Sequence, residues 1–219
     1  MKVRMRFVKR GPIKYIGHRA LMRFFQKVFR RSGLDVSYSQ GFNPHQKISI
    51  AFPLPLGTTG THEYMDIELD AEMAGGELIS RLNNALPPDI RVSEVKIPQT
   101  KTSTLKRAAY TVEIELKESV PELKNEIEKL LDSSEIIVEK KTKRGISETD
   151  IKPSIVSYEI VESDNRKLVI KLVLSCEDGA SLKASVVADA MVKYINGFEI
   201  DIMRINREGL FLENMTEIC

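Results

Sequence analysis

The chain has 219 residues, of which 42% are apolar and 29% charged, with 33 Lys and Arg against 31 Asp and Glu. This composition is too apolar for a disordered chain, and there is no 18-residue apolar run that would span a membrane. We therefore expect a globular, cytoplasmic protein of one large or two small domains, without a secretory leader. The two cysteines, Cys176 and Cys219, exclude a disulfide scaffold, a zinc knuckle and an iron–sulfur cluster held by this chain alone.

Basic residues are concentrated at the start of the chain. Residues 1–50 contain twelve Lys or Arg and one acidic residue, Asp35, whereas the other 169 residues contain 21 basic and 30 acidic ones. This asymmetry predicts a surface that faces an anionic partner, with nucleic acid first and an acidic protein surface second. The alternative is that the basic half pairs with the acidic half inside the molecule.

The first half of the chain is predicted to contain strands and helices in a regular order. Apolar and basic residues alternate over residues 2–7, which indicates a half-buried strand. A helix should run from Gly17-His18 to Gly33, with an apolar stripe made by Leu21, Phe24, Phe25 and Val28. The other expected elements are strands at Val36–Ser39, Ile48–Phe52 and His62–Leu69, a helix at Gly76–Leu86 and a strand at Arg91–Ile97.

The second half repeats this order after a polar, basic segment. A strand at Tyr110–Leu116 is followed by a capping-box pattern, Ser119 with Glu122, which predicts the start of a helix. The remaining expected elements are strands at Glu135–Lys141, Ile155–Val161 and Leu168–Ser175, a helix at Ser181–Ile195 and a strand at Glu199–Ile205.

The repeated order predicts an α+β fold of two tandem ferredoxin-like (βαββαβ) halves, each an antiparallel sheet with helices on one face. We expect the basic half at residues 1–98, a linker at 99–107 and the second half at 108–219. The other sheet face would be open, and RNA-binding modules of this shape use it. Arg4 and Arg6 would point to that face, unless Asp66 and Glu68 on the neighbouring strand pair with them.

The first helix is a better indication of an anionic partner. Its exposed face should carry five cations and no acid, whereas an ordinary solvated face mixes both signs. With Lys47, these cations are the candidate RNA- or anion-binding residues: Arg19, Arg23, Lys27, Arg30 and Arg31. They would hold phosphates without regard to base sequence. The other interpretation is an ordinary exposed helix face.

A loop after this helix combines an aromatic residue, a glycine, a proline and several hydrogen-bonding side chains. The candidate recognition loop consists of Tyr38, Ser39, Gln40, Gly41, Phe42, Asn43, Pro44 and His45. Phe42 or Tyr38 could stack on a base, while the polar side chains reach base edges. The other interpretation is a rigid turn with Phe42 in the core.

Sequence motifs of common enzyme classes are missing. The chain has no phosphate-binding loop, no HExxH pair and no GxSxG elbow, and His18, His45 and His62 are not spaced as a metal site. His18 marks the start of the first helix. We assign no catalytic residue, no metal and no cofactor, and expect a binding protein rather than an enzyme.

Two motifs carry a resemblance to a known family: Ile16-Gly17-His18 before the first helix, and the run YSQGFNPH at residues 38–45. Over about residues 3–70 the chain resembles the radical SAM-linked domain family of prokaryotes, and it agrees loosely elsewhere. A Leu-Asp pair commonly follows the histidine in that family, whereas this chain has Arg19-Ala20. The resemblance implies a stand-alone accessory to a separately encoded radical SAM enzyme, without radical chemistry of its own because the three-cysteine cluster motif is missing.

Three hypotheses follow. The first is a non-catalytic RNA-binding adaptor that recognises a structured RNA, transfer or ribosomal, for a radical SAM partner. The second is a protein-interaction subunit that docks on the radical SAM protein without RNA. The third is a metal-independent endoribonuclease that uses His45 or His18 with Tyr38 as acid–base groups. No membrane partner is expected.

Overall fold

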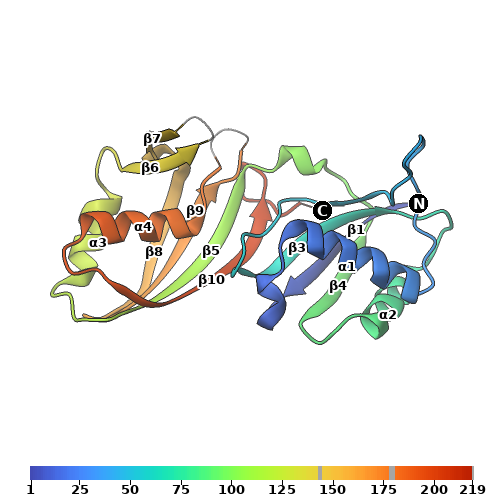
Figure 1. The fold of residues 1–219 in the computed structure, drawn as a ribbon, viewed down its shortest axis with the longest axis horizontal. Coiled ribbons are helices and arrows are strands. Elements are labelled where there is room, and N and C mark those ends of the chain that lie inside the picture. Colours follow the sequence, from blue (N-terminus) through green and yellow to red (C-terminus); the bar gives the residue numbers. More distant parts are fainter. Residues whose placement is uncertain (143–144, 178–180, 219) are drawn as a thin grey trace. The chain divides into compact units, whose positions relative to one another are not determined.

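Residues 1–142, 145–177 and 181–218 are described by a computed structural model, which has a mixed α+β fold (Figure 1). The described residues form a large, mostly antiparallel sheet and four α-helices. The chain divides into one unit of Met1–Leu105 with Arg207–Cys219, and a second unit of Lys106–Asn206. The segment after Asn206 therefore belongs to the first unit, although the sequence division at 99–107 placed it in the second half. Cys219 itself lies outside the described residues.

The first unit follows the element order expected from the sequence. Its elements are β1 (Lys2–Lys9), α1 (His18–Arg31), β2 (Ile48–Ile50), β3 (Thr59–Glu68), α2 (Gly75–Ala85) and β4 (Ile90–Lys96), with 3-10 turns at Gly11–Tyr15 and Thr102–Thr104. The strand order is β4-β1-β3, and both neighbours of β1 are antiparallel to it. The short strand β2 and the last strand, β10 (Ile200–Phe211), each pair with β3.

One predicted strand of this unit is reduced to isolated bridges. Residues 36–39 pair only through Val36 with Leu69 and Tyr38 with Gln46. The second of these bridges closes the base of a loop, so the chain leaves the neighbourhood of β3 at Tyr38 instead of continuing a ladder along it. The expected strand at 48–52 is correspondingly short, ending at Ile50.

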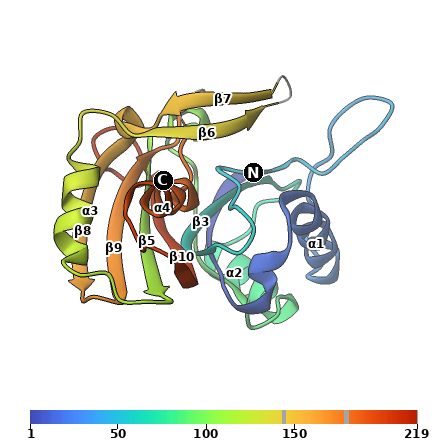
Figure 2. The same ribbon diagram turned by 60° about the vertical axis from the view of Figure 1, so that its left-hand side comes forward.

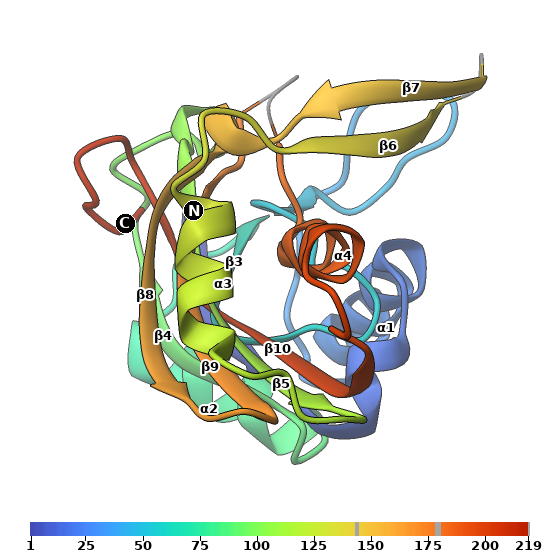
Figure 3. The same cartoon turned by 90° about the vertical axis from the view of Figure 1, so that its left-hand side faces the viewer.

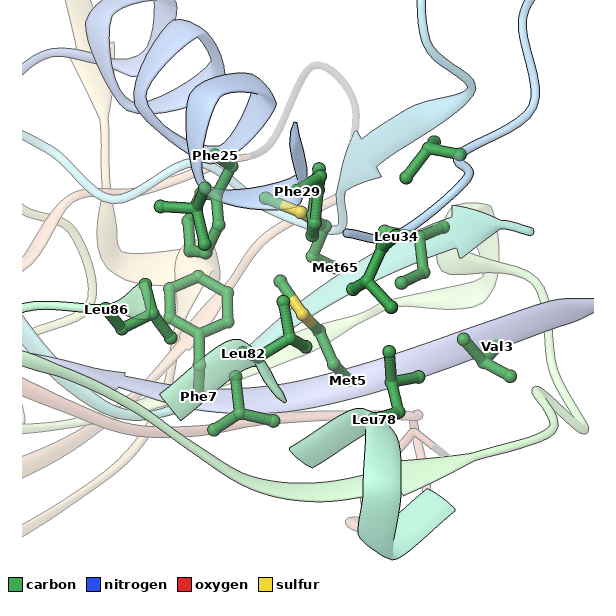
Figure 4. Close-up of a cluster of buried hydrophobic side chains, with 14 of the residues drawn as sticks. Val3, Met5, Phe7, Phe25, Phe29, Leu34, Met65, Leu78, Leu82 and Leu86 are labelled. Carbon is green, nitrogen blue, oxygen red and sulfur yellow. The ribbon is translucent and has the colours of Figure 1, made fainter. Parts of the chain in front are cut away.

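Both helices of the first unit pack on one face of its strands and enclose a core (Figure 4). The core contains Val3, Met5 and Phe7 from β1, Leu21, Phe25, Val28 and Phe29 from α1, and Leu78 and Leu82 from α2. The ring of Phe25 meets that of Phe7 edge-on, with 5.2 Å between centroids, a favourable aromatic geometry. Phe29 is buried and Phe24 only partly so, whereas the predicted stripe contained Phe24.

The second unit has the same order with an insertion. Its elements are β5 (Arg107–Leu116), α3 (Leu123–Leu131), β6 (Ile137–Thr142), β7 (Gly145–Asp150), β8 (Ile155–Ser163), β9 (Lys167–Ser175), α4 (Ala184–Tyr194) and the start of β10, with a 3-10 turn at Lys152–Ser154. The strand order is β10-β5-β9-β8, while β6 and β7 pair with each other as a separate hairpin. Figure 3 shows α3 and α4 on one face of the strands and the hairpin beside them.

This unit contains one strand that the sequence analysis did not predict, and it lacks one predicted helix cap. The hairpin partner β7 was not expected, because its sequence is polar and carries no strong period-two pattern. The predicted capping box does not form: α3 begins at Leu123, and Glu122 is its N-cap, in the left-handed region at φ 52° without a side-chain cap. The existence of α3 was predicted correctly, since its apolar side is set by Leu123, Ile127 and Leu131.

Candidate nucleic-acid interface

The basic face of α1, which we define as Arg19, Arg23, Lys27, Arg30 and Arg31, lies opposite the buried side of this helix. All five side chains are exposed. The helix contains no acidic residue, and in the described part of the chain none of Arg19, Arg23, Lys27 and Arg30 has an ion-pair partner. Like charges spaced three or four residues apart on a helix repel one another. The face therefore costs some helix stability and leaves its positive charge available to an anion.

The end of α1 is shaped by its own sequence. Gly33 follows the C-cap Ser32 at φ +66°, a left-handed conformation that glycine adopts without steric cost. Arg31 donates from Nη2 to the carbonyl oxygen of Ala85 at 3.1 Å, and the positive charge suits the negative end of the helix dipole. Arg31 is thus oriented by α2, whereas the other four cations are not held by any such bond in the described residues.

The candidate recognition loop is closed at its base by Ser39 and His45. The backbone N–H of Ser39 donates to the carbonyl oxygen of His45 at 2.8 Å, and the backbone N–H of His45 donates to Oγ of Ser39 at 3.1 Å. Oγ of Ser39 also lies 2.9 Å from Nδ1 of His45. Through these contacts, Ser39 and His45 hold the two ends of the loop together. Figure 2 shows the loop extending away from the first unit on the side of its sheet that α1 covers.

The tip of this loop presents an aromatic ring to solvent. Phe42 is fully exposed, and Tyr38 at the base is 46% exposed. Gly41 adopts φ +124°, which a residue with a side chain rarely does, and the turn therefore depends on glycine. Gln40, Asn43 and Pro44 are also exposed. The alternative that Phe42 fills the core is wrong, and the loop carries an apolar ring with nothing packed on it in the described structure.

Lys47 does not share the properties of the helix cations. Its Nζ lies 2.8 Å from Oε1 of Glu68 on β3, so its charge is compensated inside the molecule. The pair links the segment between the loop and β2 to β3. We therefore separate Lys47 from the basic face of α1.

The second face of the first unit's sheet is not open, contrary to our expectation. Arg4 is 3% exposed, and its guanidinium donates to both carboxylate oxygens of Asp66, at 2.6 and 3.1 Å, and to the carbonyl oxygen of Thr100. Arg6 lies 3.6 Å from Glu94 and 3.6 Å from Glu217. The predicted cross-strand pair of Arg4 with Asp66 is confirmed, while Glu68 pairs with Lys47 instead of Arg6.

Segments far apart in the sequence cover this second face. Thr100 comes from the stretch after β4, and Glu217 and Ile218 come from the end of the described chain. Ile218 is 1% exposed, and Glu217 also accepts from Nδ1 of His62 at 2.7 Å. Burial and the neighbouring Glu217 carboxylate raise the pKa of the Tyr64 hydroxyl on the same face. The basic strand β1 is therefore no candidate for nucleic-acid contact.

A buried charged cluster in the first unit was missed by the sequence analysis. Arg207, Glu63 and Lys9 are each at most 1% exposed. Arg207 donates from Nε to Oε1 of Glu63 at 2.8 Å, and its Nη2 also donates to Oε2 of Glu63 and to the carbonyl oxygen of Phe52. Nζ of Lys9 lies 3.3 Å from the carbonyl oxygen of Ile16. Burial raises the pKa of Glu63, against the effect of Arg207, and burial lowers the pKa of Lys9, against the effect of Glu63.

One signal could have revealed part of this cluster. Lys9 continues the odd-numbered series of inward-facing residues on β1, after Val3, Met5 and Phe7, so a lysine there predicts a buried acid nearby. The partner positions, 63 and 207, are not recoverable from local patterns, since they come from β3 and β10. The cluster binds the end of the chain to the first unit and contributes no exposed group to the basic face of α1.

The histidines do not gather into one site. His18 is exposed at the start of α1, His45 closes the loop and His62 contacts Glu217. Among the described residues there is no group of three or more His, Cys, Asp or Glu that could hold a metal ion. The helices seen in the same residues are each too short or too polar to cross a membrane. Cys176 is buried.

Known proteins were compared with this chain both by sequence and by fold. A family model described as "Uncharacterized protein conserved in bacteria (DUF2344)" matches residues 2–184. No curated protein matches the sequence. A chain of "Crystal Structure of a Cbf5-Nop10-Gar1 Complex" is similar with a TM-score of 0.51 and 12% identity, over 94% of this chain and 47% of that one. For "Crystal structure of the archaeal box H/ACA sRNP Nop10-Cbf5 complex" the TM-score is 0.49 and the identity 11%, over 94% and 46%. The chain thus spans about half the length of these solved chains, and the first likeness concerns the fold alone.

Proposed function

The chain belongs to the bacterial family DUF2344, and we propose that it is a non-catalytic RNA-binding accessory protein. The observation that carries this proposal is the basic face of α1, where four exposed cations have no acidic partner in the described structure. A row of cations of this kind is suited to the phosphates of a nucleic-acid backbone, because each cation can neutralise one phosphate and release a counterion. Binding of transfer or ribosomal RNA that weakens steeply between low and moderate salt is the test.

In this proposal the loop at residues 38–45 recognises unpaired bases. A solvent-exposed phenylalanine at the tip of a loop whose ends are held together is suited to stacking on a base, because the ring needs no rearrangement before the base covers it. The neighbouring Gln40 and Asn43 supply amide donors and acceptors for base edges. Structured RNA offers such bases in its loops and bulges.

Replacing Phe42 with alanine is expected to weaken RNA binding by about 5- to 150-fold, since stacking of one base on an aromatic ring contributes roughly 1–3 kcal/mol. The free energy of unfolding should stay unchanged, because the ring is fully exposed. Phe42→Tyr is the matched control and should retain affinity. Equal affinities of the Ala and Tyr variants in a filter-binding or fluorescence titration would exclude stacking at this position.

The partner is proposed from the resemblance carried by YSQGFNPH. We infer that the protein presents its RNA to a separately encoded radical SAM enzyme and lacks the cluster itself. Purification of a tagged chain from its own cells, with and without nuclease treatment, tests this. Loss of the radical SAM protein on nuclease treatment is expected. Association that persists without any RNA would favour a protein-interaction subunit that docks on the enzyme directly.

For the fold, we propose that each unit is ferredoxin-like. Both units follow the βαββαβ order, with β6 and β7 inserted in the second. The strand orders β4-β1-β3-β2 and β10-β5-β9-β8 correspond to each other position by position. This correspondence supports an internal duplication with a boundary at residues 99–107.

A further inference from the structure

An open hollow lies where the C-terminal ends of α1 and α2 approach each other. It has a volume of about 440 Å³ and is lined by Arg31, Ser32, Arg81, Asn84 and Ala85. That volume is within the usual range of small-ligand sites, roughly 300–1,000 Å³. It is much larger than a single phosphate requires. We propose that this hollow binds one phosphorylated nucleotide of the RNA strand, an inference that rests on the proposed function.

The two arginines of the hollow are positioned by cross-bonds between the helices. Arg31 of α1 donates to the carbonyl oxygen of Ala85 on α2, and Arg81 of α2 donates from Nη1 to the carbonyl oxygen of Gly33 after α1, at 3.4 Å. A guanidinium has five N–H donors, so these bonds leave most of them for a ligand. Because the side chains are already oriented, little rotamer freedom is lost when a phosphate binds between them.

The other groups of the hollow fit a nucleotide rather than a bare anion. Asn84 is exposed, and its amide both donates and accepts, as contact with a base or ribose requires. The hydroxyl of Ser32 donates to the carbonyl oxygen of Phe29 and keeps its lone pairs for accepting. Arg31 is also the last residue of the basic face of α1, so an RNA strand that follows this face reaches the hollow.

Among the described residues, Glu77 is the one acid that forms an ion pair with a side chain lining the hollow. Its Oε1 lies 2.6 Å from Nη2 of Arg81, one helical turn away on α2. This carboxylate competes with a phosphate for the guanidinium. If the two arginines only cap the helix ends, removing the carboxylate would not change nucleotide binding; if they form a phosphate site, its removal strengthens binding.

The test titrates nucleoside 5′-monophosphates and the matching nucleosides into the full chain by NMR or calorimetry. Saturable binding of the monophosphates, much weaker binding of the nucleosides, and at least a tenfold loss in Arg81→Gln are expected. Glu77→Gln should bind about two- to fivefold more tightly. Arg10→Gln removes an exposed arginine that does not line the hollow and should bind like the unchanged protein.

Two results would overturn this inference alone, and one would overturn the proposed function together with it. Monophosphate binding that is unaffected by Arg81→Gln and Glu77→Gln places the ligand elsewhere. Binding of mononucleotides with no binding of a 5′-phosphorylated RNA oligonucleotide makes the hollow a free-nucleotide site and removes RNA from both proposals. RNA binding that depends on α1 but not on Arg81 or Asn84 leaves the proposed function standing and excludes the hollow.

Discussion

Replacing Arg23 and Lys27 together with glutamate is expected to abolish binding of transfer and ribosomal RNA. Both side chains are exposed on the middle of α1 and lie one turn apart, without an ion-pair partner in the described structure. The double reversal removes two attractive contacts with phosphates and adds two repulsive ones. For this double glutamate variant we expect the affinity for RNA to fall by about a hundredfold or more at low salt. The double variant Arg23→Gln, Lys27→Gln removes the two charges without reversing them, and it should decrease the slope of log affinity against log salt concentration by about 2. Filter binding over a salt series measures both.

The second unit offers a control with the same change in net charge. Lys124 and Lys129 are exposed on α3, a helix that also carries Glu126 and Glu128. Their double reversal to glutamate alters the total charge identically but affects a face that already mixes signs. RNA binding should stay within about twofold of the unchanged protein at the same salt concentration. Equal losses in the two double variants would mean that net charge, not the basic face of α1, determines binding.

Replacing Glu63 with glutamine is expected to destabilise the protein by about 3–5 kcal/mol, because it leaves a buried arginine without its counter-charge. Arg207 is 0% exposed and donates to Glu63 through two nitrogens, and Lys9 lies in the same cluster. Arg207→Ala should cost a similar amount, because it removes the hydrogen bonds that the buried carboxylate of Glu63 accepts from the guanidinium. Since the chain has no tryptophan, urea unfolding is best followed by circular dichroism.

The same strand provides the matched control for this prediction. Glu68→Gln is chemically identical and also breaks an ion pair on β3, but the pair with Lys47 is about 40% exposed. An exposed pair contributes at most about 1 kcal/mol, so this variant should unfold close to the unchanged protein. The triple variant Lys9→Met, Glu63→Leu, Arg207→Met removes all three buried charges and should be more stable than Glu63→Gln alone. Equal effects at positions 63 and 68 would contradict burial as the cause.

The first fifty residues show how far local patterns lead to a site. The spacing of Leu21, Phe25 and Val28 predicts both the helix and its buried side, and so it also predicts that the cations at the other positions are exposed. The polar loop with glycine and proline was likewise predicted in place. Whether Phe42 fills the core or faces solvent could not be predicted, because a single aromatic residue between turn residues has no periodicity.

The charge of β1 illustrates the opposite case. Alternation predicts that Arg4 and Arg6 share a face, but not that the face is covered. Thr100, which contacts Arg4, lies 96 residues after it in the chain, and Glu217, which contacts Arg6, lies 211 residues after it. No local pattern encodes such a contact. The count of twelve basic residues therefore overstated the free charge, since Lys47 and the arginines of β1 are compensated internally.

By itself, the sequence determined the α+β class, the order of the helices and strands apart from β7 and residues 36–39, and the cationic side of α1, because these depend on side-chain periodicity over a few turns or strand residues. Only the tertiary structure decided which cations keep their charge, that residues after Asn206 belong to the first unit, and that Lys9, Glu63 and Arg207 meet in its interior. The physical reason is that a charge is neutralised by whatever lies within a few ångströms of it, and those neighbours are brought together by the fold from distant parts of the chain.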